Sequence, residues 1–122
     1  MTLLRLGLLA LLTCLLSGCQ KENQPPPAVA LEETPKTIES SFAQAPESAK
    51  QAASEAAAAI RSSNPSRAWA SLQELSARSD LTPEQRQAAA QSLIAVGKEL
   101  NDAAARGDRS AQQVLELHRA HK

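Results

Sequence analysis

Few side chains in this 122-residue sequence could do chemistry. Two cysteines, Cys14 and Cys19, supply thiols, whose deprotonated form is a nucleophile. Near the other end, His118 and His121 stand three residues apart, one helical turn, so their imidazoles could meet. Two ligands are too few for a protein metal site without a third, and Glu116 falls on a different helix face. We therefore expect no metal here, and a solvated turn whose cations suit the helix dipole.

No catalytic motif accompanies these residues in the sequence. A glycine-rich phosphate loop and the patterns G-x-S-x-G, C-x-x-C and H-E-x-x-H are all missing. The carboxylates mostly stand near Lys or Arg at helical spacing, which is the usual pattern of a solvated helix surface. The sequence therefore favours a protein that is not an enzyme and that has no small-molecule substrate.

An apolar stretch precedes the second cysteine. Arg5 is the only charged residue within residues 1–18, and residues 6–16 form the uncharged run LGLLALLTCLL. These 11 residues would span roughly 16 Å as a helix, whereas a membrane-spanning helix needs about 20 residues. We interpret residues 1–18 as an export signal that is removed, and we exclude them from the folded domain.

The end of this run, Leu16-Ser17-Gly18-Cys19, resembles the lipobox of bacterial lipoproteins: an aliphatic residue, a small residue, Gly or Ala, then Cys. The resemblance implies that lipoprotein signal peptidase recognises Leu16, Ser17 and Gly18 and cuts before Cys19. It also implies that Cys19 becomes the mature N-terminus, with a diacylglyceryl group on its sulfur and usually an acyl chain on its amine. Several acyl chains are enough for stable membrane anchoring. The alternative is an ordinary secretory signal with a chance cysteine.

The residue after the cysteine bears on location. It is Gln20 rather than Asp, which is similar to lipoproteins that are sorted to the outer membrane and face the periplasm. The resemblance covers only the first 19 residues and implies nothing about the rest of the chain. We expect a lipid-anchored protein of the bacterial cell envelope.

Removal of residues 1–18 would change the chemistry of the chain. The remaining cysteine, Cys19, would be consumed by lipid, so we expect no disulfide and no cofactor beyond this covalent lipid. Of 13 basic and 13 acidic residues, only Arg5 would be lost. The nearly neutral mature chain has no electrostatic reason to bind nucleic acid.

Residues 19–35 are expected to form a disordered tether rather than part of the domain. Pro25, Pro26 and Pro27 favour extended polyproline II structure. Residues 20–34 could reach at most roughly 45 Å in this conformation. The tether would let the folded body stand off from the membrane, and a simple spacer is favoured over a proline-recognition motif.

The remaining residues, 36–122, are predicted to form an all-α domain. Alanine, the best helix former, occurs 24 times in the chain, and the β-branched and aromatic residues that strands favour are few. We predict a small bundle of three to four helices that form antiparallel hairpins. Because large apolar residues are scarce, core burial barely exceeds the entropic cost of ordering the chain. We expect a marginally stable monomer, or one stabilised by a partner or a second copy.

The first predicted helical segment covers residues 36–62. Its apolar residues recur every three or four positions and share one face: Phe42, Ala45, Ala49, Ala52, Ala56 and Ile60. Pro46 interrupts the segment because it lacks a backbone N–H donor, so it should end one helix or begin the next.

The second predicted helix covers about 65–78. Asn64 is a suitable N-cap, and Pro65 suits the first helical position. The predicted buried stripe contains Ala68, Trp69, Leu72 and Leu75. We interpret the sole tryptophan as a core residue, with a ligand-binding or surface role as the alternative.

The third predicted helix covers about 83–106. Thr82 and Gln85 form a capping box at its start, and Gly107 offers a C-cap. A 4-3-4-3 rhythm predicts a seam for another helix: Ala89, Leu93, Val96, Leu100 and Ala103. Gly97 lies beside this seam, and a close contact there would compensate its cost of about 1 kcal/mol relative to Ala.

The last predicted helix covers about 108–121, with Asp108 as its N-cap. One face carries Ala111, Val114, Leu115 and His118. These expectations together predict a membrane-anchored scaffold or adaptor that binds protein partners or its own copies.

The alternative function rests on Lys122. Murein lipoproteins also begin at a lipidated cysteine, are helical, and end in a lysine joined to peptidoglycan, and this chain resembles them at its two ends only. It lacks their long heptad array and the Tyr before their terminal basic pair. In this alternative, Lys122 would attach the protein to the cell wall.

Overall fold

A computed structural model describes residues 29–122 of the chain. The expected export signal, the expected lipobox residues Leu16, Ser17 and Gly18, and the expected lipidation site Cys19 lie outside the described residues. Within residues 29–122 the structure is all-helical, which confirms the predicted fold class. The five helices are α1 (Thr34–Ser41), α2 (Glu47–Arg61), α3 (Pro65–Ser76), α4 (Pro83–Ala105) and α5 (Arg109–Ala120). The end of the expected tether at residue 35 was placed too late, because Thr34 and Pro35 are buried in the first turn of α1 and Leu31 packs against the core.

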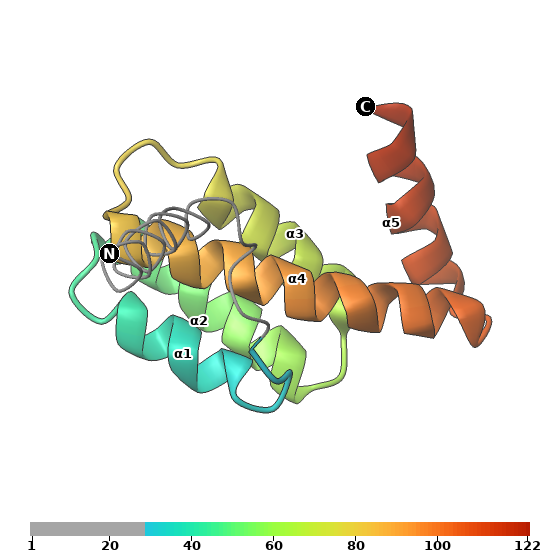
Figure 1. Ribbon diagram of the computed structural model, residues 1–122, viewed down its shortest axis with the longest axis horizontal. Coiled ribbons are helices and arrows are strands. Elements are labelled where there is room, and N and C mark those ends of the chain that lie inside the picture. Colours follow the sequence, from blue (N-terminus) through green and yellow to red (C-terminus); the bar gives the residue numbers. More distant parts are fainter. Residues whose placement is uncertain (1–28) are drawn as a thin grey trace, which may run out of the picture.

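The first four helices form a bundle (Figure 1). Consecutive helices run in opposite directions, as the predicted antiparallel hairpins require. α1 packs on α2, α2 on α3, α3 on α4, and α4 returns to α1, so the four helices close a ring around their shared core. α5 contacts only the end of this bundle, through α4 and α3, and points away from it.

The bundle was predicted to have three to four helices, and the described residues form five. The extra helix arises because the predicted segment 36–62 is divided into α1 and α2. Pro46 adopts extended backbone angles, φ −53° and ψ 149°, and stands directly before α2. α1 ends earlier, and the backbone N–H of Phe42 donates to the carbonyl of Ile38 as the last turn closes. The proline therefore separates two helices, as its missing N–H predicts.

Local signals set the ends of the later helices. The side chain of Asn64 accepts a hydrogen bond from the backbone N–H of Arg67 at 3.1 Å, which caps α3. Thr82 and Gln85 exchange hydrogen bonds of 3.2 and 3.0 Å at the start of α4, which confirms the capping box. Gly107 follows α4 with φ +95°, a left-handed conformation that glycine adopts readily.

The core of the bundle is made largely of alanine. α2 buries Ala49, Ala52, Ala53, Ala56, Ala57 and Ala59. Because alanine side chains are short, α2 can approach α1 and α3 closely. Across residues 29–122, twelve alanines are buried, against seven larger apolar side chains: Ile38, Phe42, Leu72, Leu75, Leu81, Val96 and Leu100. The predicted face of the first segment is confirmed, with Ile60 only half-buried.

Candidate interaction surface

A second, smaller apolar cluster holds α5 against the bundle. Its fully buried members are Leu100 and Ala103 of α4 and Ala111 of α5. Val114 and Leu115 of α5 pack against them and remain half-buried. The predicted apolar face of the last helix is therefore confirmed, but Ala111 is the only residue of α5 that is fully buried.

Trp69 of α3 connects this cluster with the main core. Its side chain packs against both groups of buried residues and is itself half-buried. The indole meets the imidazole of His118 edge-to-face, with ring centroids 5.5 Å apart and an interplanar angle of 85°. Aromatic pairs favour this geometry. Trp69 thus packs against the core, as predicted, but it is only half-buried because one side of its ring also meets α5.

Gly97 of α4 provides the space for this indole. A methyl group added at Gly97 would lie 3.0 Å from the ring carbon Cζ3 of Trp69. This distance is closer than ordinary carbon–carbon contact. The expected close approach at Gly97 is confirmed, and the group that approaches is a tryptophan ring.

The connection between α4 and α5 is short and tightly capped. Arg106, Gly107 and Asp108 link the two helices, and the carboxylate of Asp108 accepts a hydrogen bond from the backbone N–H of Ala111 at 3.1 Å. The side-chain amide of Gln112 donates to the carbonyl of Ala104 at 3.1 Å across the turn. The predicted N-cap at Asp108 and C-cap at Gly107 are both confirmed.

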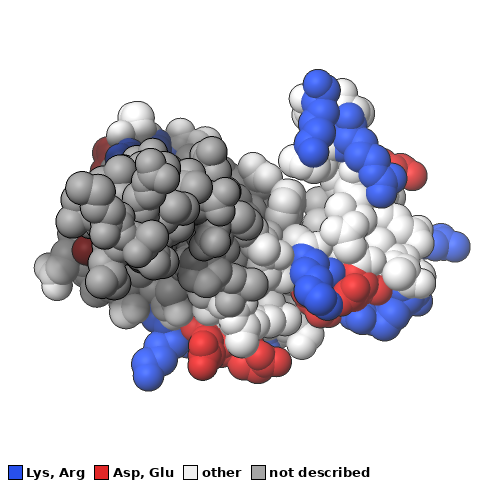
Figure 2. Space-filling model, viewed as in Figure 1, with Lys and Arg blue, Asp and Glu red and all other residues white. Residues whose placement is uncertain are grey.

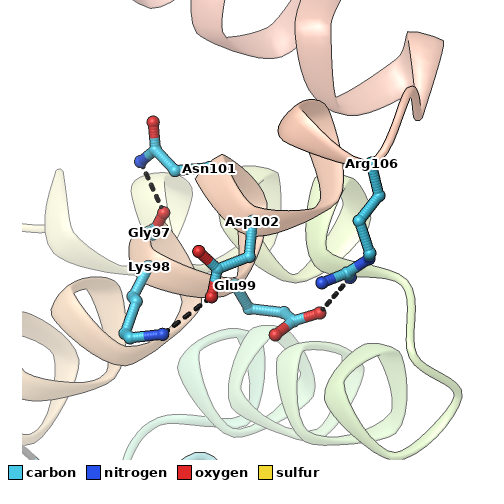
Figure 3. A network of polar contacts seen from close by, with 6 residues as sticks. All are labelled: Gly97, Lys98, Glu99, Asn101, Asp102 and Arg106. Carbon is cyan, nitrogen blue, oxygen red and sulfur yellow. Dashed lines mark hydrogen bonds and ion pairs between the residues drawn. The ribbon is translucent and has the colours of Figure 1, made fainter.

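Polar side chains cover the outer face of α4 beside this turn (Figure 3). Lys98 pairs with Asp102 at 2.7 Å, and Arg106 pairs with Glu99 at 2.8 Å. The hydrogen bond between Lys98 and Asp102 raises the pKa of the ammonium group and lowers the pKa of the carboxyl. The side-chain amide of Asn101 donates to the carbonyl of Gly97 at 2.7 Å. The partners all belong to the α4 region, so this network stabilises one helix and does not form a converging site.

A longer-range ion pair joins α1 to α2. The guanidinium of Arg61 donates two hydrogen bonds to the carboxylate of Glu39, at 2.6 and 2.8 Å. This bidentate contact lowers the pKa of the Glu39 carboxyl from its ordinary value of 4.5. It links residues 22 positions apart and therefore contributes to the pairing of these two helices.

Two large apolar side chains remain exposed on the described surface. Leu117 of α5 is 62% exposed and Ile94 of α4 is 45% exposed. In the view of Figure 2, Lys and Arg side chains lie near the C-terminal end of the chain among mostly uncharged side chains. Leu117 borders an open hollow on α5 that is also lined by Gln113, Glu116 and Ala120. The free side of α5 therefore combines one apolar side chain with charged and amide groups.

The histidines and the terminal lysine occupy different environments. His118 is half-buried against Trp69, so the expectation of a solvated turn is wrong for this residue. The apolar period that places His118 beside Ala111 and Leu115 is the signal that could have predicted its burial. His121 and Lys122 are exposed. Among residues 29–122, no three His, Cys, Asp or Glu side chains gather into a group that could hold a metal ion.

A small pocket lies where the segment before α1 and the α2–α3 turn meet α4. It is lined by residues that include Leu31, Ile60, Ala68 and Val96, and its volume is about 50 Å³. Small-molecule sites usually have volumes of roughly 300–1,000 Å³. This cavity could therefore hold ordered water but not a ligand of ordinary size.

Comparisons with known proteins found no significant match to this chain. The sequence matches no protein-family profile, and no curated protein or solved structure is significantly similar to it. Within the described part of the chain, no helix is long and apolar enough to cross a bilayer.

Proposed function

We propose that this chain is a bacterial envelope lipoprotein whose helical body is a non-enzymatic scaffold or adaptor for protein partners. The observation that carries the proposal is the sequence Leu16-Ser17-Gly18-Cys19, whose first residue ends an apolar run of 11 residues. Lipid on Cys19 would hold the protein at a membrane surface. Gln20 after the cysteine favours the outer membrane, on the side that faces the periplasm.

The surface of the body supports a role in protein contacts. α5 leaves the bundle and presents Leu117 to solvent, while its inner face contacts Trp69 and α4. A terminal helix that stands away from its bundle keeps one face free for a groove or helix of another protein. The carboxylates of the described ion pairs are engaged with neighbouring cations, which suits a structural rather than a catalytic role.

Site-specific photocrosslinking in cells tests the adaptor function. A photoreactive residue at Leu117 is expected to capture a discrete protein when Cys19 is intact, and the Cys19→Ser variant should lose this product because it is no longer concentrated at the membrane. The same photoreactive residue at Glu55, an exposed position of α2, is the matched control. No discrete product at Leu117 or at Ile94 in the anchored protein would contradict the proposal.

A second candidate function is a cell-wall tether attached through Lys122. Its side chain is exposed beyond the end of α5, so the ammonium group is accessible for amide formation. In this case, sacculi freed of detergent-soluble protein would retain the chain, and the Lys122→Arg variant would be lost from them. Sacculi that carry none of the wild-type protein would exclude this function.

A further inference from the structure

The surface that α5 covers has a defined composition. On the bundle side it consists of Trp69 from α3 and of Leu100, Ala103 and Ala104 from α4. On the α5 side it is matched by Ala111, Val114, Leu115 and His118. The structure therefore shows directly which amphipathic helix fits this surface, namely the sequence of α5 itself.

Few contacts hold α5 in its own copy. Among residues 29–122, none of the ion pairs includes a residue of α5. The side-chain hydrogen bond that ties α5 to α4 is the one from Gln112 to Ala104. With Ala111 as its only fully buried residue, α5 is the part of the described body that can open at the lowest cost.

The short connection decides where a released α5 can bind. The chain turns at Gly107, whose φ is +95°, and at Asp108, whose φ of −69° and ψ of 110° are extended. If Gly107 and Asp108 both become helical, α4 and α5 join into one continuous helix. α5 then points away from its own bundle and can reach the same surface on a second copy. Short hinges of this kind favour exchange of a terminal element between copies.

We propose that two copies of this protein exchange α5, so that α5 of each chain covers the Trp69–Leu100 surface of the other. The exchanged pair repeats the apolar contacts that α5 makes in one chain and gives up only local contacts of the turn, such as the Asp108 cap, so the conformation of the hinge controls the balance between monomer and dimer. The proposal deepens the proposed function, because it names a second copy as a partner. It rests on the α4–α5 geometry alone, so its failure would leave the lipid anchor and other partners untouched.

The decisive variant changes the hinge. Alanine at position 107 disfavours the left-handed turn and favours the continuous helix. Together these two effects should shift the turn–helix equilibrium of each hinge toward the helix by about tenfold or more. Because an exchanged dimer contains two hinges, Gly107→Ala should raise the dimerisation constant about 100-fold or more. The matched control is Gly107→Asn, since Asn tolerates the left-handed conformation and should remain as monomeric as wild type. Sedimentation of residues 19–122 with Cys19→Ser measures both.

Crosslinking distinguishes exchange from other dimers. One Gly107→Ala copy carries Ala104→Cys and another carries Gln112→Cys, both with Cys19→Ser. Each copy then has a single thiol, so a short bis-maleimide can join positions 104 and 112 only between copies. We expect a covalent heterodimer in the mixture, in clear excess over products of either copy alone. A monomeric Gly107→Ala protein, or a dimer whose two thiols do not react with each other, would overturn the proposal.

A second measurement uses the folded wild-type hinge, in case Gly107→Ala fails to fold. The same single-cysteine copies with Gly107 intact should crosslink slowly at high protein concentration, as α5 opens and closes. Four Gly and Ser residues inserted after Gly107 relax the turn and should suppress this product. Equal crosslinking with and without the insertion would contradict exchange through this hinge.

Discussion

Trp69 is the residue that joins α5 to the four-helix bundle. Its indole contacts the main core, the smaller α5 cluster, the backbone of Gly97 and the ring of His118. The sequence predicted a buried tryptophan and a close contact at Gly97, because both follow from helix periodicity and propensity. It could not show that the two predictions describe one contact, since residues 28 positions apart meet only through tertiary packing.

Gly97→Ala tests this contact. Helix propensity alone would stabilise the protein by about 1 kcal/mol, but the new methyl group would lie 3.0 Å from the indole, which is wedged between α4 and His118. We expect a net fall of about 1 kcal/mol in the free energy of unfolding, because overpacking of this kind costs about 1–3 kcal/mol. Chemical denaturation followed by Trp69 emission measures it. The control Ala90→Gly, at an exposed position of α4, should show the propensity effect alone. A stabilised Gly97→Ala variant would contradict the tight contact.

The Glu39–Arg61 pair makes a prediction about pH. Because the hydrogen bond to Arg61 lowers the pKa of the Glu39 carboxyl in the folded protein, the pair contributes stability above the ordinary pKa of 4.5. This contribution is lost as the pH falls through the lowered value. The difference in unfolding free energy between wild type and Glu39→Gln should therefore be small and constant near neutral pH, and should vanish in acid.

The control for this pair is Glu47→Gln. Glu47 is 89% exposed and stands 3.8 Å from Lys50, so it lacks a bidentate partner. Urea unfolding at several pH values compares the two variants. A Glu39→Gln difference that persists unchanged below pH 3 would show that the ion pair is not its source.

At the scale of the helices, local sequence was sufficient for most boundaries. Asn64, the Thr82–Gln85 capping box and Gly107 followed by Asp108 stand where the structure begins and ends α3, α4 and α5. These signals act within a single turn and therefore need no tertiary information. The turn between α2 and α3 shows the limit, because Ser63 adopts a left-handed φ of 55° that its residue type does not suggest.

The packing arrangement of the helices was harder to predict from the sequence. Alternating hairpins follow from short connections, but the closure of α4 onto α1 and the departure of α5 from the bundle depend on which faces meet. The alanine-rich face of α2 could equally have packed against other helices. Small alanine side chains allow helices to approach closely, but they do not select one partner by shape. Larger side chains, such as Phe42, Leu72 and Leu75, give the core of the bundle its shape.

Two leucines of α5 provide a matched test of how this helix is held. Leu115 packs against the smaller cluster, whereas Leu117 is 62% exposed. Leu115→Ala should cost about 1–2 kcal/mol, because a half-buried leucine loses part of its apolar contact. The loss should appear first as faster amide exchange in α5, with α1–α4 little changed.

Leu117→Ala is the control for the docking of α5, and it should change stability by less than about 0.5 kcal/mol. Residue-resolved hydrogen exchange compares the two variants under one condition. Equal loosening of α5 in both variants would show that the contact face has been assigned to the wrong side of the helix.

For the whole molecule, the two parts of the chain carry different information. The described body, residues 29–122, defines a helical bundle with a terminal helix on one end, and within it no three His, Cys, Asp or Glu side chains gather into a metal-binding group. The proposed location comes from Cys19 and the residues before it, which lie outside the described part. Lipidation of Cys19 can be tested directly, because a sulfur-linked lipid on the first mature residue changes the mass of the protein.

The intact mass of the detergent-extracted mature protein tests the central claim most directly. We expect a chain that begins at Cys19 and carries a diacylglyceryl group, with or without an additional acyl chain. Cys14→Ser should give the same mass, because that cysteine leaves with residues 1–18, whereas Cys19→Ser should give no acylated product. A wild-type chain that begins at another residue, or that begins at Cys19 without lipid, would contradict the account.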